Sequence, residues 1–146
     1  MRILIDADGC PVVREAVKAA EDYRLECVIF CDTSHEFNSS YARVVTVSKG
    51  ADSADLALVN AAHSGDIAVT QDYGLAAMCL SRGCEAIDQD GTVFDDTNID
   101  SMLFARYNAK KIRMSGGRLK GPSKRKPEQN KRFFESLCRL IEKSIK

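Results

Sequence analysis

The fold of this chain is decided near its start, in the stretch RILIDADGCPVVREAVKAA at residues 2–20. The run ILI at residues 3–5 is short, continuous and apolar, which is typical of a strand buried on both faces of a sheet. Residues 11–23 follow as a predicted helix, in which Pro11 falls near the first turn, where proline is best tolerated. A buried strand that is followed closely by a helix indicates a β–α unit of a parallel sheet.

The same alternation of strand and helix continues through the middle of the chain. Further strands are predicted at residues 26–31, 42–47, 66–70 and 84–88, and further helices at residues 52–63 and 73–83. The stretch DGTVFDDTN, residues 90–98, is rich in turn residues and is predicted to be a turn region. This pattern predicts an α/β fold, a three-layer α/β/α sandwich around a mainly parallel sheet of about five strands.

The last part of the chain differs in character. One helix is predicted through residues 99–112, and SGGRLKGPSKRK, residues 115–126, combines glycines with basic residues and predicts a loop. Residues 127–145 form a predicted amphipathic helix, whose apolar face at helical spacing consists of Phe133, Phe134, Leu137, Leu140 and Ile141. We therefore expect one α/β domain over residues 1–114, with the basic loop and C-terminal helix of residues 115–146 packed on it.

The composition is that of a globular domain, with 45% hydrophobic and 29% charged residues among 146. No apolar run reaches the ~18 residues that a membrane span requires, and charges interrupt the start too early for a secretory signal. We therefore expect a cytoplasmic protein with no membrane partner. The six cysteines contain no CxxC pair, so they are expected to be mostly small buried side chains and not zinc ligands.

The charges are unevenly distributed, although 21 basic and 21 acidic residues cancel over the chain. Residues 1–108 carry 8 Lys or Arg and 18 Asp or Glu, whereas residues 109–146 carry 13 and 3. Such asymmetry is typical of an acidic site beside a basic partner-binding element, although a basic tail can also simply neutralise an acidic body. Clustered Lys and Arg attract phosphate backbones, so nucleic acid is the expected partner. The candidate phosphate-binding residues are Lys120, Lys124, Arg125 and Lys126.

Acidic residues follow three of the predicted strands. Asp6 and Asp8 follow the first strand, Asp52 and Asp55 follow the third, and Asp72 follows the fourth. Ligands of parallel α/β sheets bind at the carboxyl ends of the strands, where these side chains are expected to meet. An oxygen-rich cluster favours Mg²⁺ or Mn²⁺, and two such ions can activate water for phosphodiester cleavage.

Each acid also has a simpler structural interpretation. Asp52 and Asp55 resemble a capping arrangement at a helix start, and Asp72 could cap the helix that begins at Tyr73. Asp6 and Asp8 are harder to explain in this way, because their mutual repulsion costs free energy that a divalent cation would remove. The motif DADG also resembles that of haloacid-dehalogenase-type phosphatases, in which Asp6 would be the nucleophile. The spacing of the later candidate motifs does not fit that family, because Lys49 lies only three residues before Asp52 and leaves no room for an intervening strand and helix.

With these residues placed, the chain resembles the YaiI/YqxD family of bacterial proteins. The matching motifs are ILIDADGCPV at 3–12, GADSADLALVNAAHSGDIAVTQDYGLAA at 50–77 and LKGPSKRK at 119–126. The resemblance covers nearly the whole chain. That family is similar to the NYN branch of the PIN-like nuclease superfamily, which implies a parallel PIN-like sheet with helices on both faces and metal-dependent cleavage of RNA.

The resemblance implies roles for individual residues. Asp6 corresponds to the acid that ends the first strand, Asp55 to the acid that opens a helix, and Asp72, with Thr70 beside it, to the acid of a T-x-D pattern. The extra acids of this branch are Asp8 and Asp52. The expected function is a nuclease that uses Mg²⁺ or Mn²⁺, with RNA as a more probable substrate than DNA. The alternative is a nucleic-acid-binding module without catalysis.

Overall fold

The structure, a computed structural model, describes residues 1–33, 36–48, 53–105 and 124–145. These residues form a six-stranded sheet in the order β3-β2-β1-β4-β5-β6. The strands are β1 (Arg2–Asp6), β2 (Glu26–Asp32), β3 (Arg43–Val47), β4 (Ile67–Val69), β5 (Glu85–Ile87) and β6 (Val93–Phe94). The first five pair in parallel, and β6 pairs antiparallel with β5. The mainly parallel sheet is therefore confirmed.

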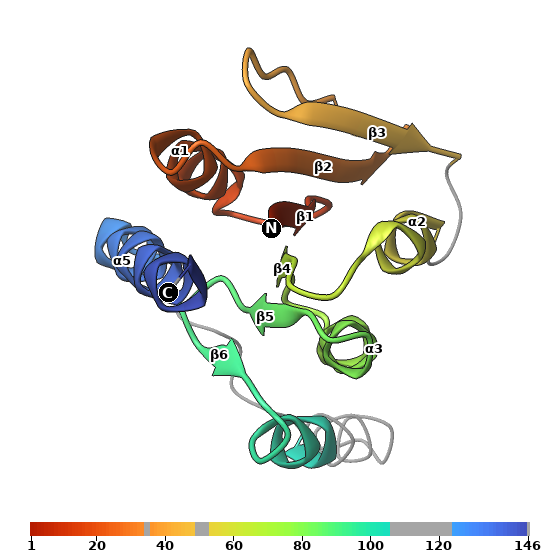
Figure 1. Ribbon diagram of the computed structural model, residues 1–146, viewed down its shortest axis with the longest axis vertical. Helices are drawn as coiled ribbons and strands as arrows, with labels where there is room; N and C mark the ends of the chain where they lie inside the picture. The colour runs from red at the N-terminus through yellow and green to blue at the C-terminus, as the bar shows by residue number, and fades with distance from the viewer. Residues whose placement is uncertain (34–35, 49–52, 106–123, 146) are drawn as a thin grey trace.

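Helices cover both faces of this sheet, as Figure 1 shows. The helices are α1 (Val13–Asp22), α2 (Ser53–Ala61), α3 (Tyr73–Ser81) and α5 (Pro127–Ile145), with a further helical stretch at residues 99–105. On one face lie α1 and α5, and on the other lie α2 and α3 (Figure 1). The predicted three-layer α/β/α sandwich is thus confirmed.

The central position of β1 explains why its sequence is apolar throughout. Ile3 and Ile5 pack into the hydrophobic cluster beneath α1 and α5, whereas Leu4 packs into the cluster beneath α2 and α3. All three side chains are fully buried, because successive residues of a strand point to opposite faces of the sheet. Most of the cysteines are buried, as predicted; the buried ones are Cys27, Cys31, Cys79 and Cys84.

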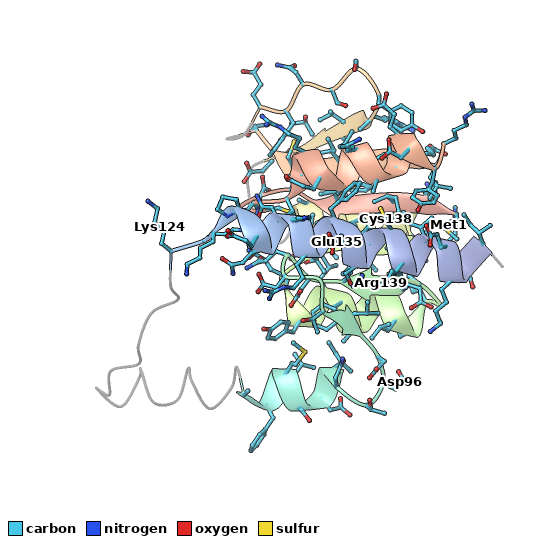
Figure 2. The ribbon with its side chains drawn as sticks, turned by 90° about the vertical axis from the view of Figure 1, so that its left-hand side faces the viewer. Met1, Asp96, Lys124, Glu135, Cys138 and Arg139 are labelled. Carbon is cyan, nitrogen blue, oxygen red and sulfur yellow. The ribbon has the colours of Figure 1, made fainter. Side chains whose placement is uncertain are left out.

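The C-terminal helix is an integral part of the core. Phe133, Leu137 and Ile141 of α5 are fully buried in the cluster beneath α1 and α5. Figure 2 shows α5 lying across the sheet beside α1, with Lys124 just ahead of its first turn. The boundaries predicted for this helix are confirmed, as is most of its apolar face; Phe134 is partly buried at the edge. No helix of the described residues is long and apolar enough to cross a membrane.

Two local predictions need correction. Residues 90–91 and 96–98 form turns or bends as predicted, but between them Val93 and Phe94 form β6 at the sheet edge. The reason is tertiary: Phe94 is 1% exposed and meets the Tyr73 ring edge-on, with ring centroids 5.6 Å apart. Pro11 lies in a turn before α1 and not in its first turn, since Val12 is the N-cap residue.

The topology defines where a ligand site can form. From β1 the chain continues to β2 and β3 on one side, and it returns to place β4 and β5 on the other side. The order of strands therefore changes direction between β1 and β4. In open parallel sheets, the crevice at the carboxyl ends of such a strand pair is the usual ligand site.

Candidate functional site

A hydrogen-bonded chain joins the carboxyl ends of β1 and β4. Ile5 pairs with Val69 in the parallel register, so the next residues, Asp6 and Thr70, also lie side by side. The Thr70 hydroxyl donates to Asp6 Oδ2 over 2.8 Å and accepts from the backbone N–H of Asp72 over 3.0 Å. Thr70 is 1% exposed. One buried hydroxyl thus fixes the Asp6 carboxylate relative to the start of α3.

Asp72 caps α3, as the structural interpretation of its position predicted. Its Oδ1 accepts from the N–H groups of Gly74 and Leu75, over 2.9 and 3.2 Å. These are two of the otherwise unpartnered donors at a helix start, which favours a carboxylate there. The cap also fixes the position of this side chain next to Thr70. Capping and a role in a ligand site are therefore compatible for Asp72.

Asp55 reaches the same region from α2. A cavity of about 320 Å³ is lined by Asp55 and Asp72 together with Leu56, Gly74, Leu75 and Met78. Asp55 lies in the first turn of α2, and α2 and α3 pack on the same face of the sheet (Figure 1). The structure therefore places Asp6, Thr70, Asp72 and Asp55 at the carboxyl edge on this face.

Asp8 lies toward β2. Its two carboxylate oxygens accept from the backbone N–H of Asp32 over 3.1 and 3.3 Å. This contact ties the turn after β1 to the end of β2, and Gly9, with φ of +75°, allows the tight course of that turn. Asp8 therefore has a structural role of its own at this edge. Asp52, the fifth predicted acid, lies outside the described residues.

Burial, with a smaller contribution from neighbouring acids, raises the pKa of Asp6. Burial raises the pKa of the Asp6 carboxyl from 3.8 to about 6; the Thr70 hydrogen bond opposes this shift, and the negative charges of Asp72 and Asp8 add to it. The negative charge of an ionised Asp6 is therefore unfavourable in the folded protein. A cation bound beside it would favour the ionised form and lower its pKa.

The donor set suits a hard divalent cation, although the described residues do not form a complete cage. In the part of the chain that the structure describes, no three His, Cys, Asp or Glu side chains are grouped closely enough to hold a metal ion. Mg²⁺ commonly keeps several waters and is held through one or two carboxylates. Asp6 and Asp72, on either side of Thr70, match that requirement in donor type.

The basic candidates lie ahead of α5. Lys124 and Lys126 are exposed, and Lys120 lies outside the described residues. Arg125 is held against the β5–β6 turn: its guanidinium donates to Asp90 Oδ1 over 2.9 Å and to the Gln89 carbonyl over 2.6 Å. Its Nε donates to Asn130 Oδ1 over 2.6 Å. The charge of Arg125 is thus partly neutralised by Asp90, whereas the two lysines extend into solvent.

Several residues of this edge were not predicted. Asp32 is the last residue of β2, as Asp6 is of β1. The sequence signal for Asp32 at this edge was an acid directly after the apolar run of residues 27–31. Gly74 lies so close to Asp72 that an added Cβ would be 3.3 Å from Asp72 Oδ1. Leu56 and Met78, which line the cavity, are 58% and 44% exposed.

Comparison with known proteins places the whole chain in one family. The family model described as "Uncharacterized BCR, YaiI/YqxD family" matches residues 4–143. A UPF0178 protein of Exiguobacterium sibiricum is 48% identical over 141 residues, which is 97% of this chain and 96% of that protein. A UPF0178 protein of Clostridium tetani is 44% identical over 146 residues, the full length of both. No solved structure matches. The chain belongs to the YaiI/YqxD family.

Proposed function

We propose that this protein is a PIN-like, NYN-type nuclease that hydrolyses phosphodiester bonds with Mg²⁺ or Mn²⁺. The observation that carries the proposal is the Asp6–Thr70–Asp72 chain at the point where the strand order reverses. The buried Thr70 hydroxyl binds the Asp6 carboxylate at the end of β1 and the backbone N–H of Asp72, whose own carboxylate caps α3. Asp55 lies on the neighbouring helix α2.

The electrostatics supports a cation at this place. The pKa of Asp6 is raised to about 6 by burial and by the charges of Asp72 and Asp8, which is the signature of carboxylates kept together at a cost in stability. Because a proton and a metal ion compete for Asp6, metal affinity should fall as the pH drops through about 6. The same arrangement without a cation would repel a polyanion.

The chain's own residues have distinct roles in the proposed reaction. Asp6 and Asp72 would hold the metal, with Asp55 and Asp52 completing or orienting its water ligands. Thr70 positions Asp6 by donating to Oδ2. When bound, the divalent ion would lower the pKa of a water molecule and stabilise the leaving oxygen of the phosphodiester.

The basic segment supports a polyanionic substrate. Residues 109–146 carry 13 basic and 3 acidic side chains, and the exposed Lys124 and Lys126 stand at the start of α5. Each phosphate that these side chains neutralise should make binding weaker at higher salt. RNA is proposed over DNA on the resemblance to NYN-type nucleases.

The test is cleavage of a fluorescent single-stranded RNA by the purified protein with millimolar Mn²⁺. Asp72→Asn should lose activity while remaining folded, because asparagine caps helices as well as aspartate does. Asp96→Asn is the matched control and should behave as the wild type, because Asp96 is an exposed acid in the turn that follows β6 (labelled in Figure 2). Equal activity of Asp72→Asn and wild type, or no cleavage by either with Mn²⁺ or Mg²⁺, contradicts the proposal.

The charge distribution also favours a second candidate, a nucleic-acid-binding module without catalysis. In that case RNA binding, measured by fluorescence anisotropy, should persist unchanged in chelator and should weaken steeply with salt. Mn²⁺ separates the two candidates: without Mn²⁺ the nuclease loses both tight RNA binding and cleavage, whereas the binding module keeps its RNA affinity and cleaves RNA under neither condition.

A further inference from the structure

We infer that the cavity between α2 and α3 binds one unpaired nucleobase of the substrate, with Leu56 and Met78 as the residues that contact it. This inference rests on the proposed function and names a part of its substrate specificity. The base would be that of a nucleotide next to the phosphate held at Asp6 and Asp72. A base within a duplex is stacked on its neighbours and could not enter.

The cavity has the size and the lining of a small-ligand site. Its volume of about 320 Å³ is at the lower end of the range typical of ligand pockets. Leu75, which is 1% exposed, forms a buried apolar part of the wall. Gly74 contributes no side chain, so the backbone of α3 itself borders the space. A cavity of this size suits one base and not a base pair.

Two exposed apolar side chains flank this one cavity. Leu56 on α2 is 58% exposed and Met78 on α3 is 44% exposed, and both line the same space. A single exposed apolar residue is common on protein surfaces. Two of them on adjacent helices, facing a cavity that also contains two carboxylates, form a surface for a flat apolar group. The faces of a nucleobase are such a group, and the thioether of methionine packs favourably against aromatic rings.

The charges decide which part of a nucleotide enters. The lining contains Asp55 and Asp72 and no Lys or Arg, so a phosphate group would be repelled from it. An uncharged base is not repelled, and its N–H groups can donate to carboxylate oxygens, which are acceptors when ionised. The phosphate would remain at the cation near Asp6, with the base on the side of α2 and α3.

The direct test is methyl NMR of the full chain with ¹³C-labelled methionine methyl groups, in chelator, with adenosine as the probe. The ring current of a bound base should shift the Met78 signal, while Met1 and Met102 serve as internal references. Ribose 5-phosphate, which has no base, should shift none of them. The shift should be lost in Leu56→Gln and kept in Ile145→Gln, a control at an exposed apolar residue on α5.

A kinetic measurement separates this inference from the nuclease proposal. With single-stranded RNA and Mn²⁺, Leu56→Gln and Met78→Gln should each raise KM on the order of fivefold, and Ile145→Gln should not. Cleavage with an unchanged KM in both cavity variants, or an unmoved Met78 signal with saturating adenosine, overturns the inference while the nuclease proposal stands. A Met78 shift without any RNA cleavage supports the base site and contradicts the nuclease.

Discussion

Replacing Asp6 by asparagine is expected to stabilise the metal-free protein. The pKa of Asp6 rises from 3.8 to about 6 on folding, mainly because the carboxyl is buried. Each pKa unit corresponds to about 1.4 kcal/mol, so an ionised Asp6 costs the folded state about 3 kcal/mol at pH values well above 6. Asparagine removes the charge and keeps an oxygen that can accept from Thr70. Its NH₂ group requires new hydrogen-bond partners, which offsets part of this stabilisation. The expected gain in the free energy of unfolding is therefore about 1–3 kcal/mol.

The pH dependence of this gain tests its cause. As the pH rises through 3.8 the unfolded chain releases the Asp6 proton, whereas the folded protein keeps it until about pH 6. In that window the folded state binds more protons, so its stability falls as the pH rises, and the loss is complete above about pH 6. The advantage of Asp6→Asn should therefore be full at pH 8 and about half as large at pH 5.

The assay is thermal unfolding in chelator at both pH values. For a chain of this size the gain corresponds to a rise in Tm of about 3–10 °C at pH 8. Asp96→Asn removes one negative charge from an exposed turn and should change Tm little at either pH. A lower Tm for Asp6→Asn at pH 8, or an equal gain at pH 5 and pH 8, would refute the reasoning, because the Asp6 charge would then not be the destabilising element.

Further predictions concern the neighbours of Asp6. Thr70→Val should lower the free energy of unfolding by about 1–3 kcal/mol, because it leaves the Asp6 carboxylate and the Asp72 N–H without their shared partner. Thr70→Ser should retain most of this free energy, as measured by unfolding in denaturant. Gly74→Ala places a Cβ 3.3 Å from Asp72 Oδ1 and should displace that carboxylate, so Mn²⁺-dependent RNA cleavage should fall. The Tm should stay level or rise, because alanine favours helix over glycine. Asp8→Asn should stabilise the metal-free protein less than Asp6→Asn, because the Asp8 carboxylate already accepts from a backbone N–H. Adding millimolar Mn²⁺ should raise the Tm of the wild type more than that of Asp6→Asn, since a ligand stabilises the state it binds.

The fold was largely predictable because its strongest signals are local. The apolar runs of β1 and β2 identify strands covered on both faces, and the spacing of Phe133, Leu137 and Ile141 identifies α5 with its observed boundaries. The strand β6 was not predictable in this way. It consists of two residues, and it exists because Phe94 packs against the α3 side of the sheet and pairs with Ala86, contacts that no local pattern encodes.

The site was predictable to the extent that topology determines it. Acids that follow parallel strands converge at one edge, and Asp6, Asp55 and Asp72 do lie at the same edge of the sheet. That Leu56 and Met78 are exposed and line a cavity could not be inferred from the sequence. The α3 sequence YGLAAMCLS contains no charged side chain, so its periodicity does not indicate which face is covered by the sheet and which lines a cavity.

The packing of α5 has a consequence for how the protein is made. Synthesis proceeds from the amino end, so β1 and α1 leave the ribosome long before Phe133, Leu137 and Ile141, which share one buried cluster with Ile3 and Ile5. Until those residues emerge, this cluster lacks the apolar side chains that α5 contributes to it. A nascent chain that stalls before residue 141 would present the apolar surface of this cluster to chaperones or to other chains. Ribosome-bound chains of increasing length should therefore become protease-resistant only after α5 has emerged.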